Sequence, residues 1–158
     1  MLRIGFGFDT HKLEEEHPFF LGGIELFHSK GAVGHSDADV LIHAICDALF
    51  GAAAMRDIGF HFSDKDPAFK GIDSKEILIQ TCKLIRGNSF EIQNIDSTVV
   101  LQSPKISEFI PEMVSLLSSV MNLEPGQLSI KAKTSERLGF IGREEGISAY
   151  AIALLLKA

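Results

Sequence analysis

The sequence is short of cysteine, of long apolar runs and of basic residues, and each shortage excludes a class of protein. Its two cysteines, Cys46 and Cys82, lie 36 residues apart inside apolar segments. That spacing is not typical of a metal site or of a disulfide framework, so free buried thiols in a reducing compartment are the better interpretation. The apolar runs fall far short of the roughly 20 residues that a membrane-spanning helix needs, and we expect no membrane association.

Basic residues are outnumbered by acidic ones, with 15 Lys and Arg against 21 Asp and Glu, which gives a net charge of −6. This balance argues against nonspecific binding to a nucleic acid duplex, because such binding needs a basic face that displaces counterions. A phosphate ligand remains compatible with an acidic protein if bound metal ions supply the positive charge. The first eleven residues lack the apolar stretch of a signal peptide, and we expect a cytoplasmic location.

The sequence also has no low-complexity tract, long linker or internal repeat, which predicts one domain over residues 1–158. A content of 46% hydrophobic and 23% charged residues is ordinary for a globular protein and too apolar for disorder. At this length folding buries roughly 70% of the surface of the unfolded chain, so a core can form without disulfides.

The first 27 residues carry patterns of short strands. Residues 18–27 place Gly22-Gly23 between two apolar runs, which is typical of a hairpin. Residues 2–8 alternate as a strand with large apolar side chains on one face and only glycine on the other: Leu2, Ile4, Phe6 and Phe8 against Gly5 and Gly7.

Three helices and three further strands are expected downstream. The helices run from about Asp37 to Met55 after a Ser36 cap, from a Ser74 cap to about Arg86, and from about Ser107 to Leu123. The strands cover 90–102, 128–134 and 147–156, with the last in a central position, and loops cover 57–72 and 135–146. This order predicts an α/β fold, a single-domain mixed β-sheet with helices packed mainly on one face.

Two histidines and a carboxylate are candidates for a metal site. Asp9 and His11 are two residues apart on a strand, so both side chains project from the glycine face, as metal ligands or as an ordinary ion pair. His43 lies in a helical stripe with Asp39 and Asp47, which can be a polar face with i,i+4 pairing. Alternatively, His43 is a third ligand and a carboxylate fixes its tautomer. One Asp and two His would leave zinc the open position of a catalytic site.

Two segments have the polar groups that a phosphate would need. His35-Ser36 directly precedes a predicted helix, whose N-terminal N–H groups favour anions, although a capping Ser beside a solvated His is the simpler alternative. Thr134-Ser135 leaves a predicted strand with hydroxyl donors, and Glu136 after it suits a Mg²⁺ that keeps most of its bonds to water and phosphate.

Charged residues of the two long loops are open to both functional and structural interpretations. Asp64 and Asp66 would bind sugar hydroxyls or a metal, or they would only solvate their loop. Arg143 would bind phosphate through two nitrogens, or it would pair with Glu144 or Glu145.

Five motifs together resemble the family of 2-C-methyl-D-erythritol 2,4-cyclodiphosphate synthases of the non-mevalonate isoprenoid pathway. They cover nearly the whole chain in order: GFDTH at 7–11, HSDADVxxH at 35–43, DIG at 57–59, FSDKDPAFKG at 62–71 and KTSERLGFIGREEG at 133–146. The chain departs from many members in having Lys133 and Ser135 around Thr134, which leaves a role of Lys133 at the phosphate open.

The resemblance implies a phosphorus–oxygen lyase with zinc on Asp9, His11 and His43, and Mg²⁺ or Mn²⁺ on Glu136. His35 and Thr134 would be its catalytic residues, as stabilisers of the transition state. The implied substrate-binding residues include the ligands Asp9, His11 and Glu136, the loop residues His35, Ser36, Asp57, Ile58, Gly59, Phe62, Ser63, Asp64, Lys65 and Asp66, the cytosine pocket of Leu101, Gln102, Ser103, Pro104, Lys105, Ile106 and Ser107, and Lys133, Thr134, Ser135, Phe140 and Arg143.

The implied reaction converts 4-diphosphocytidyl-2-C-methyl-D-erythritol 2-phosphate, a cytidine diphosphate derivative, into the 2,4-cyclodiphosphate and CMP. Two alternatives are a zinc-dependent phosphohydrolase, in which water attacks, and a noncatalytic trimeric module that binds nucleotides or isoprenoid phosphates. The resemblance also implies a homotrimer whose sheets face the threefold axis and whose sites lie between subunits. Independently, the run from Ile152 to Leu156 is apolar on both strand faces, whereas the helices can cover only one. Phe140 and Arg143 would then face the axis.

Overall fold

Five strands form one mixed sheet in a computed structural model that describes residues 1–157. The strands are β1 (Leu2–Glu15), β4 (Lys30–Val33), β5 (Phe90–Val100), β6 (Leu128–Lys133) and β7 (Gly146–Lys157), and a separate hairpin consists of β2 (Phe19–Leu21) and β3 (Ile24–Leu26). The three longer helices are α1 (Val40–Ala52), α3 (Ser74–Gly87) and α4 (Ile110–Met121). Single helical turns are α2 (Ile58–His61), η1 (Pro67–Phe69), η2 (Ser107–Phe109), η3 (Pro125–Gln127) and α5 (Gly139–Gly142).

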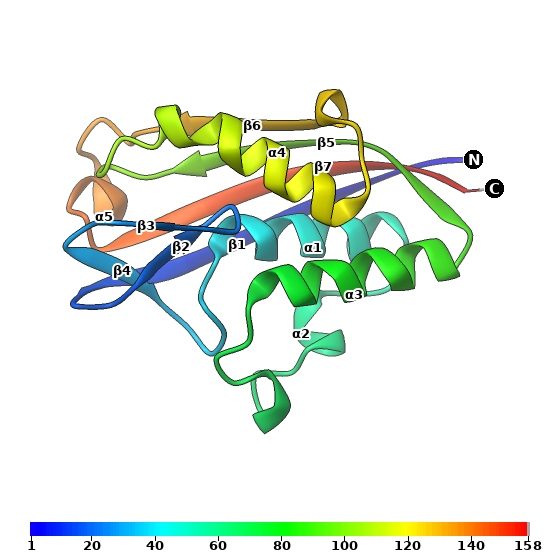
Figure 1. Ribbon diagram of the computed structural model, residues 1–158, viewed down its shortest axis with the longest axis horizontal. Coiled ribbons are helices and arrows are strands. Elements are labelled where there is room, and N and C mark those ends of the chain that lie inside the picture. The colour runs from blue at the N-terminus through cyan, green and yellow to red at the C-terminus, as the bar shows by residue number, and fades with distance from the viewer. Residues whose placement is uncertain (158) are drawn as a thin grey trace.

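The C-terminal strand β7 lies at the centre of the sheet, as its apolar sequence predicted. The strand order is β4-β1-β7-β5-β6, in which β7 is antiparallel to both β1 and β5, while β5 and β6 are parallel. The pairing of β1 with β7 runs from Leu2 opposite Leu156 to Lys12 opposite Gly146. The two termini therefore lie at the same end of the sheet (Figure 1).

The helices α1, α3 and α4 cover one face of the sheet, which confirms the predicted arrangement (Figure 1). The core lies between this face and the helices and contains one continuous cluster of buried apolar side chains. Its largest fully buried members include Leu41, Ile45, Leu49 and Phe50 of α1, Leu78 and Ile85 of α3, and Met113 and Leu117 of α4. Among residues 1–157, no helix has the length and apolar character needed to cross a bilayer.

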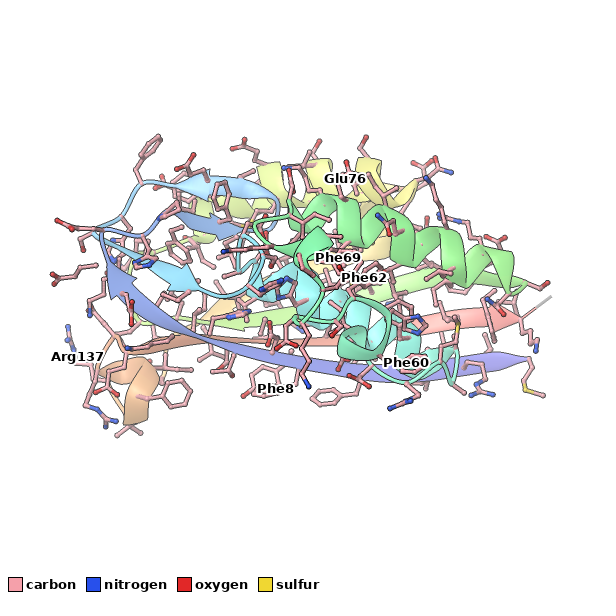
Figure 2. The ribbon with its side chains drawn as sticks, turned by 90° about the horizontal axis from the view of Figure 1, so that it is seen from below. Phe8, Phe60, Phe62, Phe69, Glu76 and Arg137 are labelled. Atoms are coloured by element: carbon pink, nitrogen blue, oxygen red, sulfur yellow. The ribbon has the colours of Figure 1, made fainter. Side chains whose placement is uncertain are left out.

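The glycine face of β1 is the face that packs against α1. A Cβ atom on Gly7 would lie only 1.9 Å from the carbonyl oxygen of Ala44, and one on Gly5 would lie 2.0 Å from that of Ala48. Glycine at both positions therefore allows the helix backbone to approach the strand directly. The opposite face of β1 is apolar and exposed, with Ile4 74% and Phe6 61% exposed, and Phe8 points away from the helices (Figure 2).

The predicted caps of α1 and α3 were wrong, because an acidic residue and not the predicted serine caps each helix. The cap of α1 is Asp39 and not Ser36, since Asp39 Oδ1 accepts the N–H of Ile42 at 3.1 Å. The cap of α3 is Asp73 and not Ser74, since Asp73 Oδ1 accepts the N–H of Lys75 at 2.9 Å. Ser36 and Ser74 are thereby free to contact other groups.

Other boundaries also differ from the prediction. The helix α1 ends at Ala52 and not near Met55, because Ala54 and Arg56 have left-handed φ values of 59° and 70°. The predicted helix over 107–123 is divided at Ile110 into η2 and α4, with Pro111 in the first turn of α4 as expected.

The remaining differences concern strands and loops. The strand β1 continues past its predicted end near His11 to Glu15, because its last four residues, from Lys12 to Glu15, pair with β4, a strand that the sequence analysis missed. The strand β5 ends at Val100 rather than at residue 102. Both predicted loops contain short helical turns, α2 and η1 in 57–72 and α5 in 135–146.

Candidate active site

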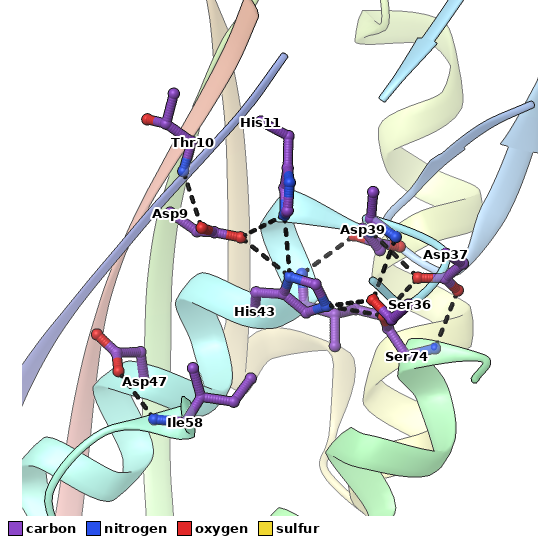
Figure 3. A network of polar contacts seen from close by, with 12 residues as sticks. Asp9, Thr10, His11, Ser36, Asp37, Asp39, His43, Asp47, Ile58 and Ser74 are labelled. Atoms are coloured by element: carbon purple, nitrogen blue, oxygen red, sulfur yellow. Dashed lines mark hydrogen bonds and ion pairs between the residues drawn. The ribbon is translucent and has the colours of Figure 1, made fainter. Parts of the chain in front are cut away.

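Three side chains that could hold a metal ion converge as the sequence predicted. Oδ2 of Asp9 lies 2.8 Å from Nε2 of His11 and 3.0 Å from Nδ1 of His43, and the two nitrogens are 3.2 Å apart. Asp9 and His11 come from the middle of β1, and His43 comes from the first turn of α1 (Figure 3). The close packing of α1 on the glycine face of β1 therefore determines the geometry of this cluster.

The outer nitrogen of each histidine ring has its own hydrogen-bond partner. Nδ1 of His11 is 3.0 Å from the carbonyl oxygen of Val33 and donates to it, which leaves Nε2, 2.8 Å from Oδ2 of Asp9, as the nitrogen that a metal would take. Nε2 of His43 lies 2.9 Å from Oγ of Ser74 and 3.1 Å from Oγ of Ser36 (Figure 3). One carboxylate oxygen and two imidazole nitrogens that face one another fit a divalent cation, and three protein ligands of this type suit zinc with an open position.

The charges of the cluster are strongly coupled. Burial raises the pKa of Asp9, but the hydrogen bonds and charges of His11 and His43 outweigh burial and lower this pKa to about 2. Burial likewise lowers the pKa of His11, but its hydrogen bond to Asp9 and the charge of that carboxylate outweigh burial and raise it above the ordinary 6.5. Asp9 is therefore an anion at neutral pH, as a metal ligand must be.

The other two members of the predicted helical stripe, Asp39 and Asp47, contact backbone groups elsewhere. Asp39 is fully buried and accepts the N–H groups of Gly22 at 3.1 Å and Gly23 at 2.7 Å, so it holds the β2–β3 turn against α1. Asp47 accepts the N–H of Ile58 at 3.2 Å and thereby ties α2 to α1. The expectation that a carboxylate fixes the tautomer of His43 is thus not met by a direct contact from this stripe.

A pocket of about 370 Å³ opens beside the cluster and collects part of the predicted substrate-binding set. The rings of Phe62 and Phe69, 5.4 Å apart, lie near each other on the α2–η1 loop (Figure 2). Asp57 precedes α2 as an exposed residue, and Ser63, Lys65 and Asp66 lie on the same loop. The lining includes predicted residues and two that were missed, Phe69 and Ile77; the predicted ones are Asp9, His11, His35, Ser36, His43, Ile58, Gly59, Phe62 and Asp64.

The predicted cytosine pocket is a second and separate hollow of about 140 Å³. Thr134 lines it, and Oγ1 of Thr134 donates a hydrogen bond to Oε1 of Glu136 at 3.2 Å. Ser135 donates to the carbonyl oxygen of Leu138 at 2.7 Å. The remaining lining consists of predicted residues together with Ala132, namely Leu101, Gln102, Pro104, Lys105, Ile106, Ser107 and Lys133. The lining residues of the two pockets do not overlap within one chain.

Neither of the predicted residues Phe140 and Arg143 lines the first or the second pocket. Phe140 lines a third hollow, which shares His11 with the first pocket. Arg143 forms a two-nitrogen ion pair with Glu145, with Nε 2.8 Å from Oε1, so of the two predicted partners the structure selects Glu145.

Besides Phe69 and Ile77, the sequence analysis missed two functional residues of the site. Ser74 was interpreted only as a helix cap, and Asp37 only as the start of a helix, whereas both belong to the network behind His43 (Figure 3). Asp37 is part of the HSDADVxxH motif, so that motif is the one signal that pointed to it.

Known proteins match this chain in sequence and in fold over nearly its full length. A model of the YgbB family matches residues 2–156. The 2-C-methyl-D-erythritol 2,4-cyclodiphosphate synthase of Porphyromonas gingivalis is 58% identical over 156 residues, which are 99% of this chain and 96% of that protein. The structure of the bifunctional IspDF from Campylobacter jejuni has a TM-score of 0.94 at 39% identity and covers 98% of this chain and 42% of its own. The IspF of Plasmodium falciparum, solved as a CDP complex, has a TM-score of 0.86 at 34% identity, over 99% and 96% of the two chains.

Proposed function

The chain belongs to the YgbB family, and from this we propose that it closes the cyclic diphosphate of 2-C-methyl-D-erythritol with release of CMP. An oxygen of the substrate's 2-phosphate attacks the β-phosphorus of the cytidine diphosphate group, and the bond from that phosphorus to the CMP oxygen breaks. The observation that carries the proposal is the convergence of Asp9, His11 and His43 beside a pocket lined by the motif residues. The names of the relatives favour this reaction over a zinc-dependent phosphohydrolase and over a noncatalytic module.

The main barrier to this reaction is electrostatic. A phosphate monoester is already a competent nucleophile at neutral pH, but two anionic phosphates must approach each other. The chain carries a net charge of −6, and the lining of the first pocket contains no Lys or Arg, so bound cations would supply most of the neutralising charge there. Divalent ions at Asp9, His11 and His43, and at Glu136, would supply Lewis acidity and positive charge at the phosphates.

Residues around the first pocket would position the phosphates and the erythritol. The imidazole of His35 is exposed at the pocket, and Oγ of Ser36 lies beside His43, so both can donate to a phosphate oxygen. The loop that bears Asp57, Asp64 and Asp66 would contact the sugar hydroxyls. The two phosphates already belong to one molecule, so positioning of this kind would hold that molecule in the folded conformation in which they meet, and this can contribute much of the rate enhancement.

The second pocket would take the cytidine end of the substrate. Its wall from Leu101 to Ser107 has little secondary structure, so backbone N–H and C=O groups are available to the hydrogen-bonding edge of a base. Thr134 lies at this pocket with Glu136 beside it. The hydroxyl of Thr134 would donate to a phosphate oxygen, and the carboxylate of Glu136 would hold a Mg²⁺ near the α- and β-phosphates. The CDP complex of the Plasmodium falciparum relative supports a cytidine nucleotide as the ligand.

We propose further that the working unit is a homotrimer with sites shared between subunits. The lining residues of the two pockets do not overlap, so joining one pocket to the other pocket of a neighbouring copy would complete a site. The outer face of β1 and β7 exposes large apolar side chains that a neighbouring sheet could cover: Leu2, Ile4, Phe6, Phe8, Tyr150 and Ile152. Near such an axis the Arg143–Glu145 pair would limit repulsion among three arginines.

Mixing two inactive variants tests the shared site. His43→Ala damages the first pocket and Thr134→Val the second, so each variant alone should release almost no CMP. After subunit exchange, activity should return, because some interfaces combine two intact halves. An absence of recovery despite verified exchange, or a monomer that is active at assay concentration, would contradict the shared site.

A zinc analysis tests the metal ligands separately. His43→Ala should lose bound zinc and turnover while its fold, measured by circular dichroism, stays intact. Stoichiometric zinc in His43→Ala would contradict the assignment of this histidine.

A further inference from the structure

The hydroxyl of Ser74 lies buried between the imidazole of His43 and the carboxylate of Asp37. Ser74 is the first residue of α3 and is 0% exposed. Its Oγ is 2.9 Å from Nε2 of His43, and its hydroxyl donates a short hydrogen bond to Oδ1 of Asp37. Its backbone N–H donates to Oδ2 of the same carboxylate at 2.9 Å. The three groups form a chain of contacts that ends at the cluster of Asp9, His11 and His43 (Figure 3).

The direction of the protons in this chain follows from what each group can donate. The carboxylate of Asp37 also accepts the N–H of Asp39 at 3.1 Å, so three donors point at it and it acts only as an acceptor. The hydroxyl proton of Ser74 is therefore committed to Asp37, and its oxygen can then only accept a hydrogen bond from Nε2 of His43. Nδ1 of His43 lies 3.0 Å from Oδ2 of Asp9 and can donate to that carboxylate when no metal is bound, whereas a metal held by Nδ1 requires the ring proton to be on Nε2, where Ser74 accepts it.

Ser36 does not impose the same choice. Its Oγ is 3.1 Å from Nε2 of His43 and accepts the N–H of Ala38 at 3.2 Å. Its own hydroxyl proton is not committed to an acceptor in the described part of the chain, so Ser36 can donate to the ring or accept from it. With Ser36 alone, Nε2 of His43 would therefore have no partner that must accept its proton.

We propose that Ser74, oriented by Asp37, is the positioning residue that fixes the tautomer and ring orientation of His43 for metal binding. The inference rests on the proposed metal site, because it concerns how that site is held. The Asp37 carboxylate is itself fixed, since the backbone N–H of Asp37 donates to the carbonyl oxygen of Ile72 at 3.1 Å. The network thus joins the segment before α1 to the start of α3, and the N-terminus of α3 becomes part of the site.

The Nε2 proton of His43 in the zinc-loaded protein is the first readout. In the wild type, ¹H–¹⁵N correlation spectra should show this proton in slow exchange with solvent, because Ser74 accepts it. In Ser74→Ala the proton should exchange faster and its signal should broaden or disappear. Asp37→Asn keeps the serine hydroxyl but removes the anion that commits its proton, so it should also speed the exchange.

The affinity for zinc is the second readout, measured by competition with a chromophoric chelator. Ser74→Ala should bind zinc roughly 10- to 100-fold more weakly than the wild type, which is the usual effect of losing such a partner. Excess zinc should then restore its turnover. Ser118→Ala is the matched control, because Ser118 is a buried serine of α4 whose hydroxyl has no partner within residues 1–157. This control should keep the wild-type affinity.

Two outcomes separate this inference from the metal site on which it rests. If His43→Ala keeps its zinc, the metal assignment is wrong and the positioning role falls with it. If His43→Ala loses zinc while Ser74→Ala and Asp37→Asn keep both the slow exchange of the Nε2 proton and the wild-type affinity, the metal site stands and the positioning role is refuted. An equal loss of affinity in Ser118→Ala would also refute it, as an effect common to buried serines.

Discussion

The substitution Gly7→Ala should displace the cluster of Asp9, His11 and His43 by disturbing the packing of α1 on β1. Gly7 lies two residues before Asp9 on β1, and its missing side chain faces Ala44, the neighbour of His43 on α1. An added Cβ would stand 1.9 Å from the carbonyl oxygen of Ala44 and 2.5 Å from the backbone nitrogen of Ala48. Both contacts are backbone atoms, so no side chain can rotate away and the strand and helix must separate.

The size of the effect follows from these distances. Ordinary contact would require α1 and β1 to move apart by roughly 1.5 Å. Overpacking of this kind usually costs about 1–3 kcal/mol, and the rigid neighbours place Gly7→Ala near the upper end. A metal site tolerates displacements of its ligands of only about 0.5 Å. Zinc affinity should therefore fall at least tenfold as Asp9 and His11 separate from His43.

Urea unfolding and a zinc competition titration measure the two consequences. Gly126→Ala is the matched control, since a Cβ at that position meets nothing within 4 Å and the glycine has no left-handed φ. The control should stay within about 0.5 kcal/mol of the wild type, as surface substitutions usually do. The reasoning is refuted if Gly7→Ala unfolds at the same urea concentration as Gly126→Ala and binds zinc equally well.

Three further predictions address stability, pH and the second metal. Asp39→Ala leaves three backbone N–H groups without their acceptor and should lower the free energy of unfolding by about 3 kcal/mol or more in urea denaturation; an unchanged value contradicts the proposed clamp. Asp9 raises the pKa of His11, so the stability that this pair gives the metal-free protein is complete between pH 3.8 and pH 6.5, the ordinary pKa values of the two groups. It is lost as pH rises through the raised pKa of His11, and again as pH falls towards the lowered pKa of Asp9 at about 2. Zinc affinity should rise as pH rises through the raised pKa of His11, because zinc competes with the proton for this ring. Thermal melts with and without zinc that show parallel pH profiles would contradict this. Glu136→Gln should lower turnover and raise the Mg²⁺ requirement without changing zinc content, and kinetics unaltered across a magnesium titration would argue against a Mg²⁺ role.

Much of the fold was predictable because long periodic segments report burial directly. The alternation of glycine with large apolar residues in β1 identified both faces of that strand, and the parity of Asp9 and His11 placed them on the helix side. The apolar C-terminal run identified the central strand β7. The strand β4 was missed because its four residues are too short to show a period.

The capping residues and the network behind His43 were not predictable to the same degree. Ser36, Asp37 and Asp39 can each cap a helix, and the choice depends on which backbone groups the fold brings near. Asp39 became the cap because the β2–β3 turn adds two N–H donors to its carboxylate. Ser74 contacts His43 from 31 residues away. No local pattern encodes that approach, because it depends on how α3 packs against α1.

Phosphorus NMR of the reaction products tests the central claim most directly. The purified protein is incubated with zinc, Mg²⁺ and 4-diphosphocytidyl-2-C-methyl-D-erythritol 2-phosphate, and the spectrum is followed over time. A cyclase should give the two coupled resonances of a cyclic diphosphate together with equimolar CMP, and His43→Ala should give neither. Products in which the β-phosphate has gained water, with no cyclic diphosphate, would contradict the account and would identify a phosphohydrolase.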